Sequence, residues 1–158
     1  MHKYNSWSMP VVDFTDFSGA TCSNIKWALE GYSLFIGTAY SSSADYYADI
    51  QANSYANNTE NVSRFGPKSP NKRTAIGSRF QSTYGNQTVL AVFTTASAWE
   101  VRNNMKNMIG CSMGVMLDGG GSSQIAWKTS SGTKSYWDAG GENRAIQTMV
   151  TVNADTWA

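Results

Sequence analysis

Short runs of hydrophobic residues, bounded by glycine, serine, asparagine or proline, recur along this chain and predict a sheet. Strands are expected where these runs are apolar throughout or alternate with polar positions, namely residues 32–40, 72–77, 88–94, 113–117, 124–128, 135–137 and 145–152. Tyr84-Gly85-Asn86 has the composition of a hairpin turn before residues 88–94. The short connections favour antiparallel neighbours.

Helical spacing of apolar residues occurs in fewer places. Residues 21–29 are predicted to form a helix, and residues 45–55 are a tyrosine-rich candidate for a second one. Ser97-Ala98-Trp99-Glu100 has the spacing of a capping box, in which a hydroxyl and a carboxylate satisfy the first N–H groups of a helix. This third helix is expected to end at Gly110, with Val101, Met105, Met108 and Ile109 on its core face and Arg102, Asn103 and Lys106 on its solvent face.

No repeat or linker divides these elements. We therefore predict one α+β domain over residues 1–158, with a mixed, mostly antiparallel sheet packed against two or three helices. Residues 1–18 are expected to form an irregular N-terminal arm, and residues 138–143 a glycine-rich loop.

Composition narrows the class of protein. Charged residues make up 15% of the chain, against about 25% in ordinary soluble domains, and the net charge is +1. This balance argues against a nucleic-acid partner, and no apolar run is long enough for a membrane span. The neutral surface with 13% aromatic residues is compatible with a homo-oligomer and favours an extracellular or phage-associated location.

The cysteines and the start of the chain add little. Cys22 and Cys111 are interpreted as two separate buried thiols in preference to a disulfide. With His2 as the only histidine they make no zinc ligand set. The first ten residues show no apolar segment of a signal peptide, so the localisation stays open.

The most informative segment is Asp118-Gly119-Gly120-Gly121-Ser122-Ser123, which follows an apolar strand. Three consecutive glycines weaken a fold unless the backbone must approach another group closely or take a positive φ. A carboxylate, unshielded N–H groups and two hydroxyls thus gather at one strand end, which suits an anionic or polyhydroxylated ligand. The alternative is a tight turn with no ligand.

The order of several motifs resembles the phosphodiester glycosidase family. Arg73-Thr74-Ala75-Ile76-Gly77 comes first, then the capped helix, then Leu117-Asp118-Gly119-Gly120-Gly121-Ser122-Ser123, and last Gly141-Glu142-Asn143-Arg144. The resemblance covers the chain from about Lys72 to its C-terminus. It implies cleavage between the anomeric carbon of a sugar and a phosphate oxygen, with a phosphorylated carbohydrate or sugar phosphate as substrate.

That chemistry needs positive groups, because a phosphodiester carries a negative charge at neutral pH. Arg73 and Arg144 are candidates for binding phosphate oxygens, and Thr74 belongs to the same motif as Arg73. The alternative for each arginine is an ordinary surface position or an ion pair with Asp118 or Glu142.

The glycine segment offers further ligands. The N–H groups of Gly119, Gly120 and Gly121 are predicted to form a nest for a phosphate oxygen, and Ser122 and Ser123 to hydrogen-bond sugar or phosphate. A serine triad is disfavoured because the general base that it needs is missing from this part of the chain.

Carboxylates are the candidate catalytic groups. Asp118 comes first and Glu142 second, as a stabiliser of an oxocarbenium-like transition state, a nucleophile or an activator of water. Asp118 is also the one candidate ligand for Ca²⁺ or Mg²⁺, although no cofactor is certain. Trp127, Tyr136 and Trp137 either stack on a sugar ring or pack against the sheet.

Three functions remain open at this stage. The first is a hydrolase of sugar-1-phosphodiesters. The second is a non-catalytic module that binds a phosphorylated glycan on a phage or cell surface. The third is a protein that binds or hydrolyses a phosphorylated nucleotide-sugar metabolite inside the cell.

Overall fold

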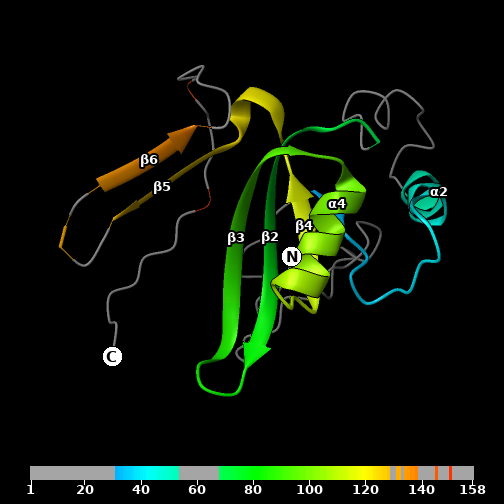
Figure 1. Cartoon of the computed structure of the whole chain (residues 1–158), viewed down its shortest axis with the longest axis horizontal. Helices are drawn as coiled ribbons and strands as arrows, with labels where there is room; N and C mark the ends of the chain where they lie inside the picture. The colour runs from blue at the N-terminus through cyan, green and yellow to red at the C-terminus, as the bar shows by residue number, and fades with distance from the viewer. Residues whose placement is uncertain are drawn as a thin grey trace, which may run out of the picture.

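The computed structural model describes residues 31–53, 68–128, 131, 132, 134–138, 145 and 150. Figure 1 shows its helices and strands. In chain order these are β1 (Tyr32–Ser33), α2 (Ser43–Asn53), β2 (Asn71–Gln81), β3 (Gly85–Ala96), α4 (Ala98–Asn103), the π-helix η2 (Asn104–Met108), β4 (Met113–Leu117), the 3₁₀ turn η3 (Gly120–Ser122), β5 (Gln124–Lys128) and β6 (Lys134–Asp138).

The main sheet has four strands in the order β1-β4-β2-β3, and each neighbouring pair is antiparallel. β5 and β6 form a separate antiparallel pair that leaves the sheet where β4 ends (Figure 1). Together with the helices this makes an α+β fold, which confirms the class predicted from the sequence. Strands β4 and β5 have the predicted bounds, and each begins directly after a serine, Ser112 or Ser123.

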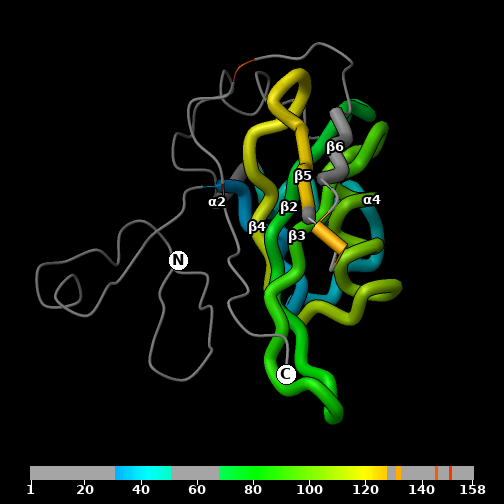
Figure 2. The backbone as a smooth tube through the Cα atoms, turned by 90° about the vertical axis from the view of Figure 1, so that its left-hand side faces the viewer, coloured from blue at the N-terminus to red at the C-terminus, as the bar shows by residue number. Residues whose placement is uncertain are grey.

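The two faces of the sheet carry different side chains. α4 lies across one face (Figures 1 and 2), where Ala75 and Met116 pack with Val101 and Met105 in the main core. On the opposite face, Ile76 and Val115 form a smaller cluster with Leu90, Met113 and Leu117. Successive strand residues point to opposite faces, so the position of a residue in β2 or β4 decides which cluster it joins.

The capping box at the start of α4 is formed as predicted. The backbone N–H of Ser97 donates to Glu100 Oε2 at 2.7 Å, and the N–H of Glu100 donates to Ser97 Oγ at 3.3 Å. The bonds that the N–H and then the Oγ of Ser97 donate to Glu100 Oε2 lower the pKa of Glu100. The cap therefore fixes where the helix starts, directly after β3.

Two of the predicted helix positions were wrong. Met108 was expected in the core and is 80% exposed, whereas Arg102 was expected in solvent and is 3% exposed. The π-helical turn Asn104–Met108 holds one extra residue, which rotates Met108 away from the sheet. Ile109 is only partly buried against the core, and Gly110 follows with a φ of +79°.

Arg102 is buried among aromatic rings. Its guanidinium carbon lies 4.9 Å from the ring centre of Tyr40 and 5.2 Å from that of Trp99. Its Nη2 donates to the carbonyl oxygen of Thr38 at 2.5 Å, and its Nε has no hydrogen-bond partner in the described part of the chain. Cation–π contacts replace part of the lost hydration, which is why a charged residue can stand on the core side of this helix.

The strand predicted over residues 32–40 is also wrong beyond its first residues. β1 ends at Ser33, and Phe35 adopts a φ of +43°. The chain then turns, and the N–H of Thr38 donates to the carbonyl of Phe35 at 3.0 Å. Leu34 and Ile36 still reach the core, so the apolar pattern identified burial but not conformation.

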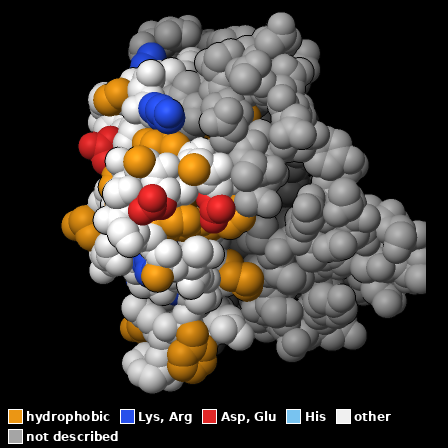
Figure 3. Space-filling view, turned by 90° about the vertical axis from the view of Figure 1, so that its right-hand side faces the viewer, with side chains coloured by type: hydrophobic (Ala, Val, Ile, Leu, Met, Phe, Trp, Pro, Cys, Tyr) orange, Lys and Arg blue, Asp and Glu red, His pale blue; other side chains and the backbone are white. Residues whose placement is uncertain are grey.

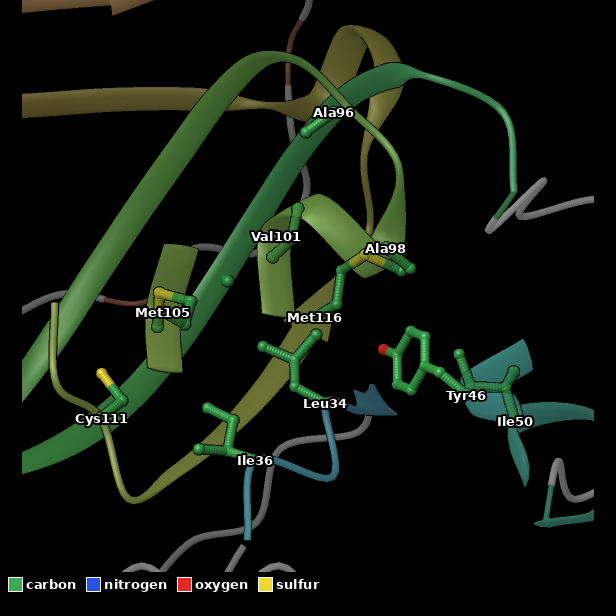
Figure 4. Close-up of a cluster of buried hydrophobic side chains, with 11 residues drawn as sticks. Leu34, Ile36, Tyr46, Ile50, Ala96, Ala98, Val101, Met105, Cys111 and Met116 are labelled. Carbon is green, nitrogen blue, oxygen red and sulfur yellow. The ribbon is translucent and has the colours of Figure 1, made fainter. Parts of the chain in front are cut away.

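α2 begins two residues before the predicted helix, because Ser42 caps it. The N–H of Asp45 donates to Ser42 Oγ at 3.3 Å. Tyr46 and Ile50 from α2 enter the core, and the hydroxyl of Tyr46 points toward Leu34 and Met116 (Figure 4). That hydroxyl has no hydrogen-bond partner among the residues that the structure describes.

Other predicted features have mixed outcomes. Cys111 is a buried free thiol. Cys22, the helix at residues 21–29 and the arm at residues 1–18 lie outside the described residues, as does almost all of the strand at residues 145–152. None of the helices in the described part is long and apolar enough to cross a membrane.

Replacing Tyr46 by phenylalanine tests the unpartnered hydroxyl. Since a buried hydroxyl without a partner opposes folding, we expect Tyr46→Phe to leave the free energy of unfolding unchanged or to raise it by about 1 kcal/mol. Tyr40→Phe is the matched control, because the Tyr40 hydroxyl donates to Asp49 Oδ2, and its loss should cost about 1–2 kcal/mol. Urea unfolding of both variants measures the difference. If Tyr46→Phe lowered the free energy of unfolding as much as Tyr40→Phe, the prediction for the Tyr46 hydroxyl would be contradicted.

The same tyrosines predict loss of stability at alkaline pH. Burial, followed by the hydrogen bond to Asp49, raises the pKa of Tyr40 to about 12, and burial also raises the pKa of Tyr46. The folded state thus holds these protons more tightly than the unfolded state, whose tyrosines titrate near pH ~10. The contribution of these protonated tyrosines to the free energy of unfolding should be fully present below about pH 10 and should fall as the pH rises toward about 12. Urea midpoints across this interval check it, and a flat profile would refute it.

Candidate functional site

The pairing of β2 with β4 builds the candidate site. Thr74 lies opposite Leu117 in the antiparallel register. One step further along the same register Asp118 comes opposite Arg73, and the next step brings Gly119 to Lys72. An added Cβ on Gly119 would lie 2.5 Å from the Lys72 carbonyl oxygen, which confirms this close approach. Segments that are far apart in the sequence therefore meet at one end of the sheet.

Strand alternation separates the candidate residues onto two faces. Arg73 follows the same face as Ala75, which packs in the main core beneath α4. Asp118, two residues after Met116, continues that face. Thr74 is two residues before Ile76 and therefore shares its face, which is the opposite one. The arginine and the carboxylate are thus cross-strand neighbours, whereas the threonine lies behind them.

Asp118 is exposed to solvent. Its Oδ1 accepts a hydrogen bond from the N–H of Gly119 at 2.8 Å, which directs one carboxylate oxygen toward the glycine segment. In the part of the chain that the structure describes, no three acidic, histidine or cysteine side chains gather to hold a metal ion. Asp118 is the residue here whose oxygens could bind Ca²⁺ or Mg²⁺.

The glycine segment takes a conformation that needs glycine at two positions. Gly119 has no room for a side chain against Lys72, and Gly120 has a φ of +61°. Residues Gly120–Ser122 then form the 3₁₀ turn η3, in which the N–H of Ser122 donates to the Gly119 carbonyl at 3.2 Å and that of Ser123 to the Gly120 carbonyl at 3.1 Å. Within the described residues, the N–H groups of Gly120 and Gly121 donate no hydrogen bond.

Arg73 is buried, with 3% of its surface exposed. Its Nε donates to the carbonyl of Ala96 at 3.1 Å and its Nη2 to the carbonyl of Ser69 at 2.9 Å. Burial lowers the pKa of Arg73, and the nearby Tyr47 raises it in part. An arginine remains charged in proteins, and this side chain ties the end of β3, at Ala96, to the carbonyl of Ser69.

The face of the molecule on which α2 lies carries no broad charged patch (Figure 3). On its described part, acidic and basic side chains are few and stand apart among hydrophobic and uncharged polar ones.

Thr74 and Ser123 contact each other. The Thr74 hydroxyl donates to Ser123 Oγ at 3.1 Å, and Ser123 has 0% of its surface exposed. Ser122, in contrast, is partly exposed. Of the two serines predicted to bind a ligand, Ser122 has surface available for one and Ser123 does not.

The structure does not place two of the other predicted site residues. Glu142 and Arg144 lie outside the described residues. Trp127 is on β5 and is 50% exposed, and β6 carries residues 136 and 137, so the aromatic candidates belong to the separate hairpin. Lys72, Ser69 and Ala96 were missed, because they contribute backbone carbonyls, which a side-chain pattern cannot reveal.

Alanine substitutions at the two constrained glycines test the loop geometry. Gly119→Ala should lower the free energy of unfolding by about 1–3 kcal/mol, since its Cβ would collide with the backbone of Lys72. In Gly120→Ala the added Cβ meets no neighbour. The strain of the left-handed conformation alone should lower the free energy of unfolding by about 1–2 kcal/mol. Gly120→Asn, which tolerates that conformation, should lose less. Urea unfolding ranks the variants, and a fully stable Gly119→Ala would contradict the close approach.

Comparisons with known proteins identify a family for this chain. A family model described as phosphodiester glycosidase matches residues 33–153. No curated protein and no solved structure matches the chain. The match includes every element of the described sheet except the first residue of β1, and all of the glycine segment. By this match over most of its length, the chain belongs to the phosphodiester glycosidase family.

Proposed function

We propose that the protein hydrolyses sugar-1-phosphodiesters by cleaving the bond between the anomeric carbon and the phosphate oxygen. The observation that carries the proposal is the β2–β4 register, which ends at the pair Thr74–Leu117, directly before Arg73 and Asp118, and continues into the close approach of Gly119 to Lys72. The carboxylate of Asp118 and two N–H groups that have no partner among the described residues thereby lie at the strand end next to the position of Arg73. The family membership supports the same reaction.

The phosphate group is assigned to the glycine segment. The N–H groups of Gly120 and Gly121 and the hydroxyl of Ser122 are donors suited to phosphate oxygens. Arg73 already donates to two carbonyls, so its contribution is the field of its charge, which favours the negative charge that the leaving phosphate gains. Arg144 is kept as the arginine for direct phosphate contact.

Asp118 is assigned to the anomeric carbon. As the C–O bond breaks, the bonding electrons leave with the phosphate oxygen and positive charge develops at the sugar ring. A carboxylate beside this centre stabilises that charge or attacks it, and water finally supplies the hydroxyl group on the anomeric carbon. Glu142 is assigned as the second carboxylate. Phosphate is a good leaving group, so little acid assistance is required.

The decisive variant is Asp118→Asn, which keeps the shape of the side chain and removes its charge. We expect it to reduce sugar release from a panel of sugar-1-phosphodiesters, N-acetylglucosamine-1-phosphate esters included, by about 10²–10⁴-fold. Asp45→Asn, at an exposed carboxylate on α2, is the matched control and should keep wild-type activity. A chelator in parallel reactions shows whether Ca²⁺ or Mg²⁺ takes part.

Isotope labelling separates this reaction from phosphodiester hydrolysis. In ¹⁸O-water, cleavage at carbon places the label in the released sugar, whereas cleavage at phosphorus places it in the phosphate. Label in the phosphate would overturn the assignment of Asp118 to the anomeric carbon. Full activity of Asp118→Asn would do the same. Binding of the esters by calorimetry without any release would favour the non-catalytic glycan-binding module.

A further inference from the structure

The glycine segment is held in place from the back of the sheet. Ser123 immediately follows η3 and is fully buried, and its Oγ accepts the hydrogen bond of Thr74. Thr74 shares the face of Ile76, opposite the face of Arg73. The hydrogen bond thus joins the C-terminal end of the glycine segment to the strand that carries the arginine.

The N-terminal end of the segment is fixed to the same strand. Gly119 packs so closely on the Lys72 carbonyl that a Cβ would not fit. Lys72 and Thr74 flank Arg73, so β2 holds the segment on both sides of the arginine. Between these two anchors lie the N–H groups of Gly120 and Gly121, which have no partners among the described residues.

We infer that Thr74 and Ser123 are positioning residues, which hold the donors of the glycine segment at a fixed place beside Asp118 without touching the substrate. The pattern of the sequence had assigned both to ligand binding. Burial of Ser123 and the direction of Thr74 remove them from the ligand, and leave Asp118, Ser122 and the glycine N–H groups in contact with it. The role in catalysis rests on the proposed function, but the fixing of the glycine segment by Thr74 and Ser123 does not.

The physical basis is the difference between a satisfied and an unsatisfied buried hydroxyl. When Thr74 loses its hydroxyl, the buried Oγ of Ser123 keeps no hydrogen bond from Thr74, and opening of the segment to water becomes more favourable. Loss of one such bond corresponds to about a 2- to 12-fold increase in the open population. The increase should be confined to the glycine segment, because β2 retains its backbone pairing on both sides.

Hydrogen–deuterium exchange of the full chain measures this directly. Thr74→Val keeps the shape of the side chain and removes the hydroxyl, and it should speed exchange of the hydrogen-bonded N–H groups of Ser122 and Ser123 by about 2- to 12-fold. Thr74→Ser keeps the hydroxyl and should restore exchange toward the wild-type rate. Thr88→Val, at an exposed threonine of β3, is the matched control and should leave the segment unchanged.

Ser123→Ala provides an independent variant if Thr74→Val does not fold. It removes the acceptor in place of the donor and should speed exchange of the same N–H groups. Unchanged exchange of the segment in a folded Thr74→Val or Ser123→Ala variant would overturn the inference. Thr74→Ser exchanging as fast as Thr74→Val would overturn it as well, since the effect would then not depend on the hydroxyl.

Kinetics distinguish positioning from simple stabilisation. With a sugar-1-phosphodiester that the wild type hydrolyses, Thr74→Val should lower kcat by about 3- to 10-fold with little change in KM, because the donors are displaced by a fraction of an ångström. Thr74→Ser should recover kcat. Equal kcat in the wild type and Thr74→Val would refute the catalytic part. A wild type without any activity would refute the proposed function. The exchange comparison would still show whether Thr74 and Ser123 hold the glycine segment in place.

Discussion

The antiparallel register between β2 and β4 is the constraint on which the candidate site depends. It pairs Thr74 with Leu117, and its continuation past the end of β4 brings Asp118 to Arg73 and Gly119 to Lys72. A shift by one residue would turn Arg73 to the other face of the sheet and move Ala75 out of the core under α4. Packing of the core and assembly of the site are therefore fixed by the same pairing.

This arrangement divides the work between the two faces of one strand. On the face toward α4, the buried and charged side chain of Arg73 donates hydrogen bonds to the carbonyls of Ala96 and Ser69. The residue behind it, Thr74, holds Ser123 through a single hydrogen bond. A loop with three glycines would otherwise sample many backbone conformations, so the contacts on both faces are needed to keep its N–H groups in one orientation.

The sequence predicted best those features that depend on local chemistry. The capping box at Ser97 and Glu100 appears as expected, because both partners lie within one helical turn. The bounds of β4 and β5 followed from breaks in apolar runs. It failed where the outcome depends on distant contacts: Arg102 is buried only because Tyr40, Tyr46 and Trp99 surround it, and the π-helical turn that exposes Met108 leaves no signal in the apolar pattern.

For the candidate site, the sequence identified the residue types, but it did not distinguish residues available to a ligand from residues that position other residues. Thr74 and Ser123 stood in motifs with Arg73 and Asp118, and nothing in a linear pattern distinguishes a hydroxyl that meets a ligand from one that meets another hydroxyl. The register makes that distinction, because odd and even positions of β2 point to opposite faces. A motif of this kind thus combines residues that perform chemistry with residues that hold them. The burial of Ser123 supports its assignment to the second group, because contact with a ligand requires surface that this side chain does not have.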